Sequence, residues 1–301
     1  MKKTTIIGGA LALVAFLTGT LHAQIYVGNN GNYTGSFIIG EYGLDGSTVN
    51  ASLISYGGTV PFGLVISGGD LLVAVGHTIG EYGLDGSTIN ASLISSMAGT
   101  PFGLAISGGD IFATTISGKK SGISPIGEYG LDGSTINASL ISGLNGPAGL
   151  AISGGHIFVA TYGSGTIGEY GLDGSTINAS LISGLNGPYG LAISGGHLFV
   201  ANFGNNTIGE YGLDGSTINA SLISGLNKPA GLAISGGDIF VANNGNNTIG
   251  EYGLDGSTVN ASLISGLNGP VGIAVEPVPE PSTLALMGLG LTGLLALRRR
   301  K

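Results

Sequence analysis

Short runs rich in apolar residues, separated by glycine-rich breaks, recur along most of the chain. One period holds four runs rich in Ile, Val, Phe and Tyr, at 149–153, 156–160, 166–172 and 177–183. The breaks between them are Gly154-Gly155, the loop 163–165 and Asp173-Gly174. Runs of this length and composition predict strands, and Asp-Gly between two strands predicts a type I′ hairpin turn. Each period therefore predicts four short strands.

The period itself is repeated. The string Ile-Gly-Glu-Tyr-Gly-Leu-Asp-Gly-Ser-Thr occurs six times, with its glutamate at Glu41, Glu81, Glu128, Glu169, Glu210 and Glu251. A repeat of about 40 residues made of short strands is typical of propeller blades, whereas helical repeats of similar length need long amphipathic helices. No such helix is visible in the pattern.

The two ends of the repeat array complement each other. The array begins at a second strand, Ile25-Tyr26-Val27, and stops after a first strand, Gly272-Ile273-Ala274-Val275. Each end supplies the strand that the other lacks, which a β-solenoid would not require. We therefore predict an all-β fold, a six-bladed β-propeller closed by pairing of the N- and C-terminal strands, which leaves no long exposed edge.

The N-terminus has the organisation of a signal peptide. Lys2 and Lys3 precede an apolar run over 6–17, and Ala23 offers a small residue before a cut. The alternative, a membrane anchor, is disfavoured because the run is short for a span. We expect cleavage between Ala23 and Gln24 after export by the Sec machinery.

Three elements follow one another at the C-terminus. Pro279-Glu280-Pro281 precedes an apolar segment at 282–297, and the basic residues Arg298, Arg299, Arg300 and Lys301 follow. This end resembles the PEP-CTERM sorting signal of Gram-negative bacteria. The resemblance implies transient association with the inner membrane, cleavage by an exosortase near Pro279-Glu280-Pro281, and release to the cell envelope or extracellular matrix. A plain C-terminal anchor is the alternative.

These readings divide the chain into four parts. They are a signal peptide at 1–23, the propeller at 24–275, a linker with the Pro-Glu-Pro motif at 276–281, and a transmembrane sorting helix with its basic tail at 282–301.

The blades also resemble a known repeat family. The segments 145–152, 157–160 and 239–249 look like the NHL-repeat blade pattern, and the resemblance extends over the whole repeat region. NHL blades often carry Asp after the second strand and Arg before the third. Asn243 and Thr248 stand at those positions here, so ligand chemistry that relies on these charges is not expected.

Composition narrows the classes of partner. The chain has 60 Gly among 301 residues, no Cys and a net charge of −8. Only three Lys lie between Glu41 and Asp255, against 15 acidic residues. This charge balance disfavours nucleic acid as a partner, because phosphate binding needs clustered Lys and Arg.

The sequence offers no convincing catalytic, cofactor or metal site. The six repeated glutamates occupy equivalent environments, whereas acid–base catalysis needs groups with different environments. We expect most of them to face water. His156 and His197 occupy equivalent exposed turns, and two candidate ligands fall short of a zinc site. The Asp of each Asp-Gly turn stands alone in its loop, which disfavours a calcium site.

Residues that vary between blades are the better candidates for a ligand site. Loops expected at one mouth of the central channel carry aromatic residues and asparagines that suit sugar or peptide binding by stacking and hydrogen bonding. The candidate rim is Phe62, Phe102, Tyr162, Tyr189, Phe203 and Asn205. Packing and solvated loops are the alternative interpretation.

We therefore expect an exported, non-enzymatic binding or structural module, with a polysaccharide or an envelope protein as its candidate ligand. The alternative is a metal-dependent propeller enzyme of the lactonase or lyase type, as in NHL-like folds. Against it, the first strands read Gly-Leu-Ala-Ile-Ser and place almost no ligands in the channel.

Overall fold

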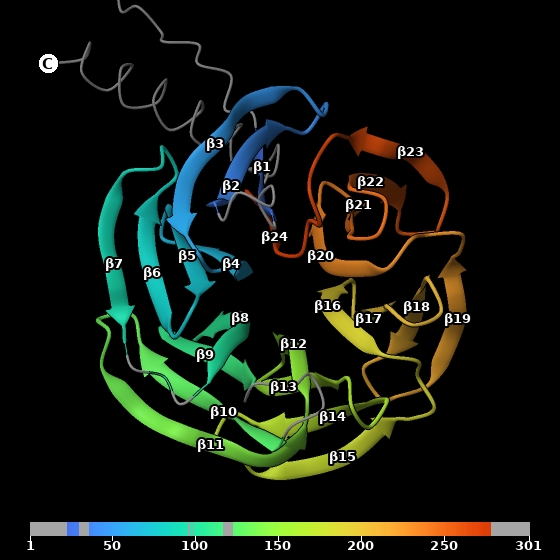
Figure 1. The fold of residues 1–301 in the computed structure, drawn as a ribbon. Coiled ribbons are helices and arrows are strands. Elements are labelled where there is room, and N and C mark those ends of the chain that lie inside the picture. The colour runs from blue at the N-terminus through green and yellow to red at the C-terminus, as the bar shows by residue number, and fades with distance from the viewer. Residues whose placement is uncertain (1–22, 30–35, 96, 98, 117–122, 278–301) are drawn as a thin grey trace, which may run out of the picture.

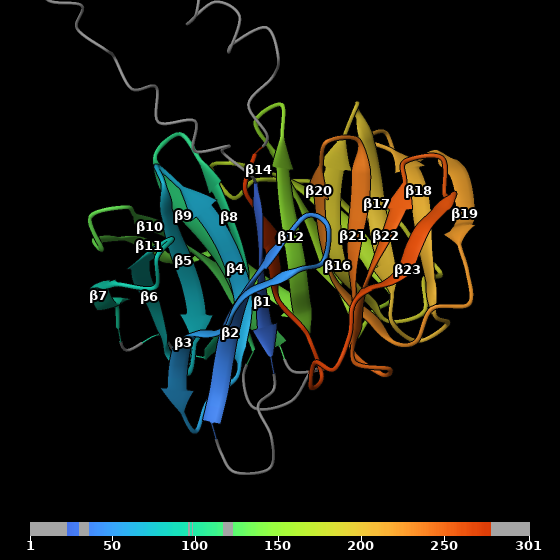
Figure 2. The ribbon, with the colours of Figure 1, turned by 90° about the horizontal axis from the view of Figure 1, so that it is seen from above.

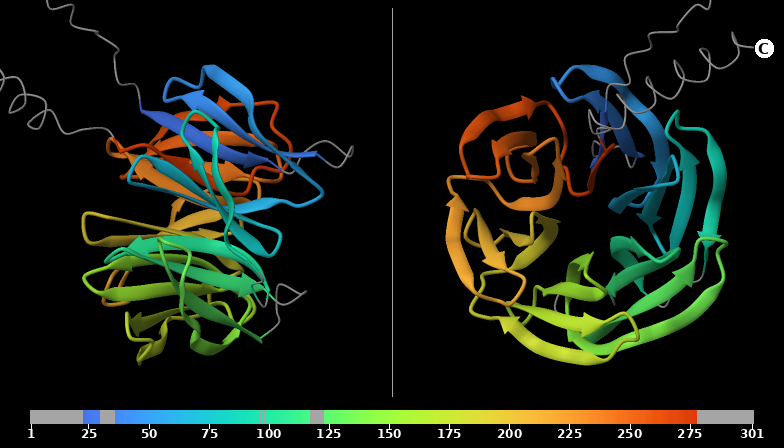
Figure 3. Two further views of the ribbon diagram at one scale, coloured as in Figure 1. Left: turned by 90° about the vertical axis from the view of Figure 1, so that its left-hand side faces the viewer. Right: turned by 180° about the vertical axis from the view of Figure 1, so that it is seen from behind.

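The computed structural model describes residues 23–29, 36–95, 97, 99–116 and 123–277. These residues form six four-stranded antiparallel sheets arranged as blades around a central axis (Figure 1). Seen from behind, the blades again encircle the central axis (Figure 3). Viewed perpendicular to the axis, the ring is a disc with strands running across its thickness (Figure 2). The all-β, six-bladed prediction is confirmed.

The innermost strands carry the first run of each period. They are β4 (Pro61–Ser67), β8 (Thr100–Ser107), β12 (Pro147–Ser153), β16 (Pro188–Ser194), β20 (Pro229–Ser235) and β24 (Ile273–Val275). The second strands are β1 (Gln24–Asn29), β5 (Asp70–Val75), β9 (Asp110–Ile116), β13 (His156–Thr161), β17 (His197–Asn202) and β21 (Asp238–Asn243).

The third and fourth strands build the outer half of each blade. The third strands are β2 (Ser36–Gly43), β6 (Thr78–Gly83), β10 (Ile123–Gly130), β14 (Thr166–Gly171), β18 (Thr207–Gly212) and β22 (Thr248–Gly253). The perimeter strands are β3 (Thr48–Gly57), β7 (Thr88–Ile94), β11 (Thr135–Asn145), β15 (Thr176–Ile182), β19 (Thr217–Ile223) and β23 (Thr258–Ile264).

The ring closes as the ends of the array predict. β24 pairs antiparallel with β1, with Tyr26 opposite Ala274, and completes the sheet β24-β1-β2-β3. Backbone bonds extend the pairing on both sides: Gly28 N donates to Gly272 O over 2.9 Å, and Glu276 N donates to Gln24 O over 3.0 Å. The two ends of the described chain are therefore held in one blade.

The hydrophobic core is divided among the interfaces between neighbouring blades. One cluster joins Phe158 and Ile182 to Leu198 and Tyr211 of the next blade, and equivalent clusters fill the other interfaces. In each third strand the tyrosine ring covers the glycine two residues before it, as Tyr211 covers Gly209. A Cβ on that glycine would overlap the ring, which explains why the glycine and the tyrosine occur together in all six repeats.

The inner strands approach one another so closely that only glycine fits between them. A Cβ built on Gly190 would overlap the carbonyl oxygen of Ala230 on the neighbouring inner strand. The equivalent glycines Gly63, Gly103, Gly149, Gly231 and Gly272 meet the same obstacle. These glycines set the narrow bore of the ring.

The two hairpin turns of a blade differ. Gly68 and Gly69 both have positive φ, 62° and 94°, as a type I′ turn requires. The Asp-Gly turn is not type I′, which corrects the sequence prediction. Only its glycine, Gly46, has positive φ (80°), because the Asp45 carboxylate accepts the Ser47 N–H over 2.9 Å and fixes a different loop.

Candidate functional site

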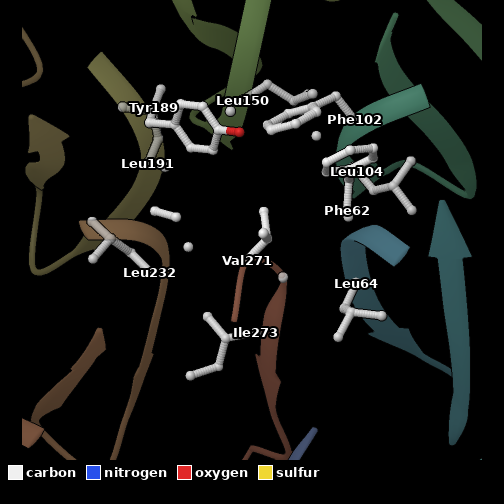
Figure 4. A pocket seen from close by; sticks show the side chains of 17 residues that line it. Phe62, Leu64, Phe102, Leu104, Leu150, Tyr189, Leu191, Leu232, Val271 and Ile273 are labelled. Carbon is white, nitrogen blue, oxygen red and sulfur yellow. The ribbon is translucent and has the colours of Figure 1, made fainter. Parts of the chain in front are cut away.

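Five aromatic side chains meet at one mouth of the central axis. We call Phe62, Phe102, Tyr162, Tyr189 and Phe203 the aromatic cluster. Its ring centroids lie 4.8 Å apart for Phe62 and Phe102, 4.9 Å for Phe102 and Tyr189, and 5.3 Å for Tyr189 and Phe203. Figure 4 shows the rings of Tyr189 and Phe102 pointing towards each other, with Phe62 next to Phe102 and leucines around them. The residues come from four blades, so only ring closure brings them together.

The rings of the aromatic cluster pack against one another across the mouth of the channel, which the sequence predicts they line. Phe102 and Tyr189 are buried, since their rings pack against those of their neighbours. Phe62, Tyr162 and Phe203 are half-buried and present the outer part of the cluster to solvent. Burial, with a smaller effect of Tyr162, raises the pKa of Tyr189, so this phenol stays neutral. The cluster thus has two buried rings and three rings that are partly accessible to solvent.

Apolar side chains fill the axis below the aromatic cluster. A cavity of about 80 Å³ is lined there by inner-strand glycines and by Leu64, Leu104, Leu150, Leu191, Leu232 and Ile273. The labelled side chains converge on the axis from all sides (Figure 4). Lactonase-type or lyase-type chemistry needs oxygen or nitrogen ligands for a metal. The side chains lining this axis are hydrocarbon apart from one phenol, so they offer no carboxylate or imidazole to hold a metal.

Asn205, the remaining rim residue, is exposed and belongs to the same loop as Phe203. It faces a second hollow, which we call the amide pocket, of about 230 Å³. The pocket lies between the end of β15 and the outer half of the β16–β19 blade. Its lining includes Asn186, Asn202, Asn205, Tyr211, Thr217 and Ser221. Sequence analysis missed this pocket because two blades contribute to it.

The repeated glutamates are less exposed than the sequence predicts. The Glu169 side chain is 12% exposed, and His156 Nδ1 lies 2.5 Å from its Oε1 across the β13–β14 pair. His197 and Glu210 repeat this contact in the next blade. Where the turn carries Asp instead of His, the two carboxylates face each other: burial and Asp238 raise the pKa of Glu251. These pairs differ in charge but not in fold position.

The expected signal-peptide cut lies where the chain enters the ring. Ala23 is buried, and Gln24 opens β1 with its backbone nitrogen donating to Glu276 Oε2 over 3.0 Å. The sorting residues Pro279, Glu280, Pro281, Arg298, Arg299 and Arg300 lie outside the described residues, as do the rest of the signal peptide and the hydrophobic segment. In the part that is described, no helix is long and apolar enough to span a membrane. Likewise, no three His, Asp or Glu side chains in that part are grouped to hold a metal ion.

Two family models match the chain. The first, the PEP-CTERM protein-sorting motif, matches residues 277–301, directly after the last strand of the propeller. The chain carries a PEP-CTERM sorting motif. The second, the NHL repeat, matches residues 226–252, which include β20 and β21. The PEP-CTERM motif indicates an exported protein that an exosortase processes, with the propeller as its folded part.

Solved structures share the fold of this PEP-CTERM propeller at low sequence identity. A chain of a nidogen/laminin complex aligns with a TM-score of 0.71 and 18% identity, covering 84% of this chain and 98% of that one. A protein of unknown function from Bacteroides caccae gives 0.64 and 16%, with the same coverage. A streptogramin B lyase gives 0.60 and 18%, covering 82% and 86%. Comparison with curated proteins finds no match.

Proposed function

We propose that the propeller is released outside the inner membrane after exosortase cleavage and acts there as a non-enzymatic binding or structural module. One observation carries this proposal. The last propeller strand, β24, ends at Val275, and the sorting motif begins at residue 277. A cut near Pro279-Glu280-Pro281 would remove the hydrophobic segment and leave all 24 strands of the ring intact.

The aromatic cluster supports a binding role. Its three accessible rings, Phe62, Tyr162 and Phe203, offer flat apolar surface beside the exposed amide of Asn205. Stacking on rings with hydrogen bonds from nearby amides suits a sugar chain or a peptide. A polysaccharide or an envelope protein is therefore the candidate ligand.

The side chains of the central channel support the proposal that the protein is not an enzyme. Catalysis needs polar groups in contrasting environments around a reacting atom. The axis offers Leu and Ile side chains there, with Tyr189 held neutral above them. The likeness to a streptogramin B lyase concerns the fold, and function belongs to the site rather than the fold.

The test uses the exported protein and the extracellular polysaccharide of its own host. We expect the protein to co-sediment with the polysaccharide, and Phe203→Ala to weaken retention about tenfold, the loss of one stacked ring. Ile177→Ala is the matched control, because Ile177 is an exposed apolar residue on the perimeter strand β15. Equal loss in both variants, or turnover of the polysaccharide by the wild-type protein, would contradict the proposal.

A further inference from the structure

The amide pocket is polar but carries no charge. Hydroxyl and amide groups from both blades converge on it, and none of its lining residues is ionised at neutral pH. Apolar atoms of Ile182, Leu185 and Ala220 form the rest of the wall. The volume, about 230 Å³, is many times the roughly 10–15 Å³ that one water needs. The pocket therefore suits a neutral molecule with several polar groups.

The side-chain amide of Asn202 lines the pocket, and its oxygen has no hydrogen-bond partner. The residue is 2% exposed, and its Oδ1 accepts no hydrogen bond. Its Nδ2 donates to Thr207 Oγ1 over 3.5 Å. Turning the amide over would only move the vacancy to the other atom. A buried polar atom without a partner costs free energy until a ligand or water supplies one.

Other blades show that the fold does not require this amide. Val75 occupies the same position at the end of β5, opposite Thr78 as Asn202 is opposite Thr207. In β13 the position is Thr161, whose hydroxyl lies 2.6 Å from that of Thr166 and 2.7 Å from that of Ser164. Those three hydroxyls satisfy one another. The fold therefore does not explain why this position carries an amide whose oxygen has no partner.

The next blade carries a buried asparagine at the same position. Asn243 ends β21, is 1% exposed, and its Oδ1 also lacks a partner. Asn246 and Tyr252 stand where Asn205 and Tyr211 stand one repeat earlier. Asn29, at the equivalent end of β1, is 3% exposed, and its Oδ1 lacks a partner too. Three successive blades thus carry the same unsatisfied amide, and in the blades of Asn202 and Asn243 it stands among the same residue types.

We propose that the amide pocket binds one neutral sugar unit, with Asn202 bonding a ring hydroxyl. A hydroxyl both donates and accepts, so it satisfies the amide in either orientation, whereas a cation or anion satisfies only one. Asn205 joins the pocket to the loop of Phe203, so a longer chain can reach the aromatic cluster as well. This inference rests on the proposed binding function and names the ligand class of a second subsite.

Ligand-observed saturation-transfer NMR tests the proposal with the exported protein and free glucose, galactose, mannose and N-acetylglucosamine, each measured alone. We expect transfer to at least one of these sugars. The double variant Asn202→Val, Asn243→Val should weaken its binding at least about tenfold, the loss of a hydrogen bond in a water-excluding site. Thr161→Val is the matched control and should bind as the wild type does, because that hydroxyl does not line the pocket.

A thermal scan without sugar separates binding from structure. Since Val75 already occupies the equivalent position, the double variant should melt no lower than the wild type. Absence of transfer to all four sugars, equal binding by the double variant, or a lower melting temperature would overturn the proposal. Co-sedimentation that depends on Phe203 would still stand in that case, so the proposed function is tested separately.

Discussion

The backbone nitrogen of Gln24 lies 3.0 Å from Oε2 of Glu276, at the point where the chain enters and leaves the ring. The return bond, from Glu276 N to Gln24 O, has the same length. Glu41 is close enough that burial and then Glu276 raise its pKa. A positive charge at Gln24 would offset the two carboxylates, and cleavage after Ala23 would create one, because it frees the α-amino group.

Removing this carboxylate should weaken the closed ring. In the processed protein, Glu276→Ala removes a charge-assisted hydrogen bond and should lower the free energy of unfolding by about 1–2 kcal/mol. Glu276→Gln keeps an acceptor and should cost less. Urea unfolding of both variants measures the difference. If unprocessed chain, whose Gln24 nitrogen is uncharged, loses as much on Glu276→Gln as processed chain does, the ion pair is not formed.

Inner-strand glycines should be intolerant of a methyl group. Gly190→Ala places a Cβ against the Ala230 carbonyl of the next blade and should destabilise the ring by about 1–3 kcal/mol, the usual range for overpacking. Gly57→Ala is the control, because no atom lies within 4 Å of its built Cβ and its φ is not positive. It should change stability by less than about 0.5 kcal/mol. Comparable losses in the two variants would contradict the close approach of the inner strands.

Stability should pass through a maximum at weakly acidic pH. Burial, with Glu276 or a facing Asp, raises the pKa of Glu41, Glu128 and Glu251. The folded state then holds more protons than the unfolded state just above the ordinary glutamate pKa, so stability falls as pH rises through that window. Hydrogen bonds from Ser lower the pKa of the turn residues such as Asp85 and Asp214, so their contribution is lost as pH falls through their lowered pKa. Urea unfolding from acidic to neutral pH should show both limbs, and a steady rise towards neutral pH would refute the first.

The repeats themselves suggest a stabilising substitution. Asp238 stands where His156 and His197 stand in other blades, and it faces Glu251. Asp238→His should raise stability by about 0.5 kcal/mol at weakly acidic pH, where an unperturbed imidazole is largely charged and pairs with the carboxylate. Asp238→Asn removes the repulsion without adding a pair and should gain less. Equal gains at acidic and at basic pH would show that the imidazole charge is not involved.

The architecture followed from local pattern because each blade is encoded within one period. Strand runs, Gly-Gly turns and the complementary ends at 25–27 and 272–275 all act through neighbouring residues or backbone pairing. The turn type predicted at Asp45 was wrong. The Asp45 carboxylate accepts a hydrogen bond from Ser47 N–H, and this bond outweighs the general preference of Asp-Gly for a type I′ turn. Which of the two effects prevails can be seen only in the folded loop.

Features formed between blades or across a hairpin were harder to predict. The contact of Glu169 with His156 is diagonal across a hairpin, and the burial of Tyr189 depends on rings from other blades, such as that of Phe102. The amide pocket joins β15 to the following blade, so a reading of one period at a time does not contain it. Its signal was the change from Val75 to Asn202 at equivalent positions, which sequence alone does not mark as buried.

The intact mass of the protein from the host's medium and from its membranes tests whether the propeller is exported, cut at both ends and released. An exported and processed propeller predicts a released species that begins at Gln24 and ends near Glu280. Because Ala23 is buried and β1 starts at Gln24, the first cut should precede folding of β1 into the ring. A membrane-bound species that retains Arg298 to Lys301, with none released, would contradict the account and make the tail a permanent anchor.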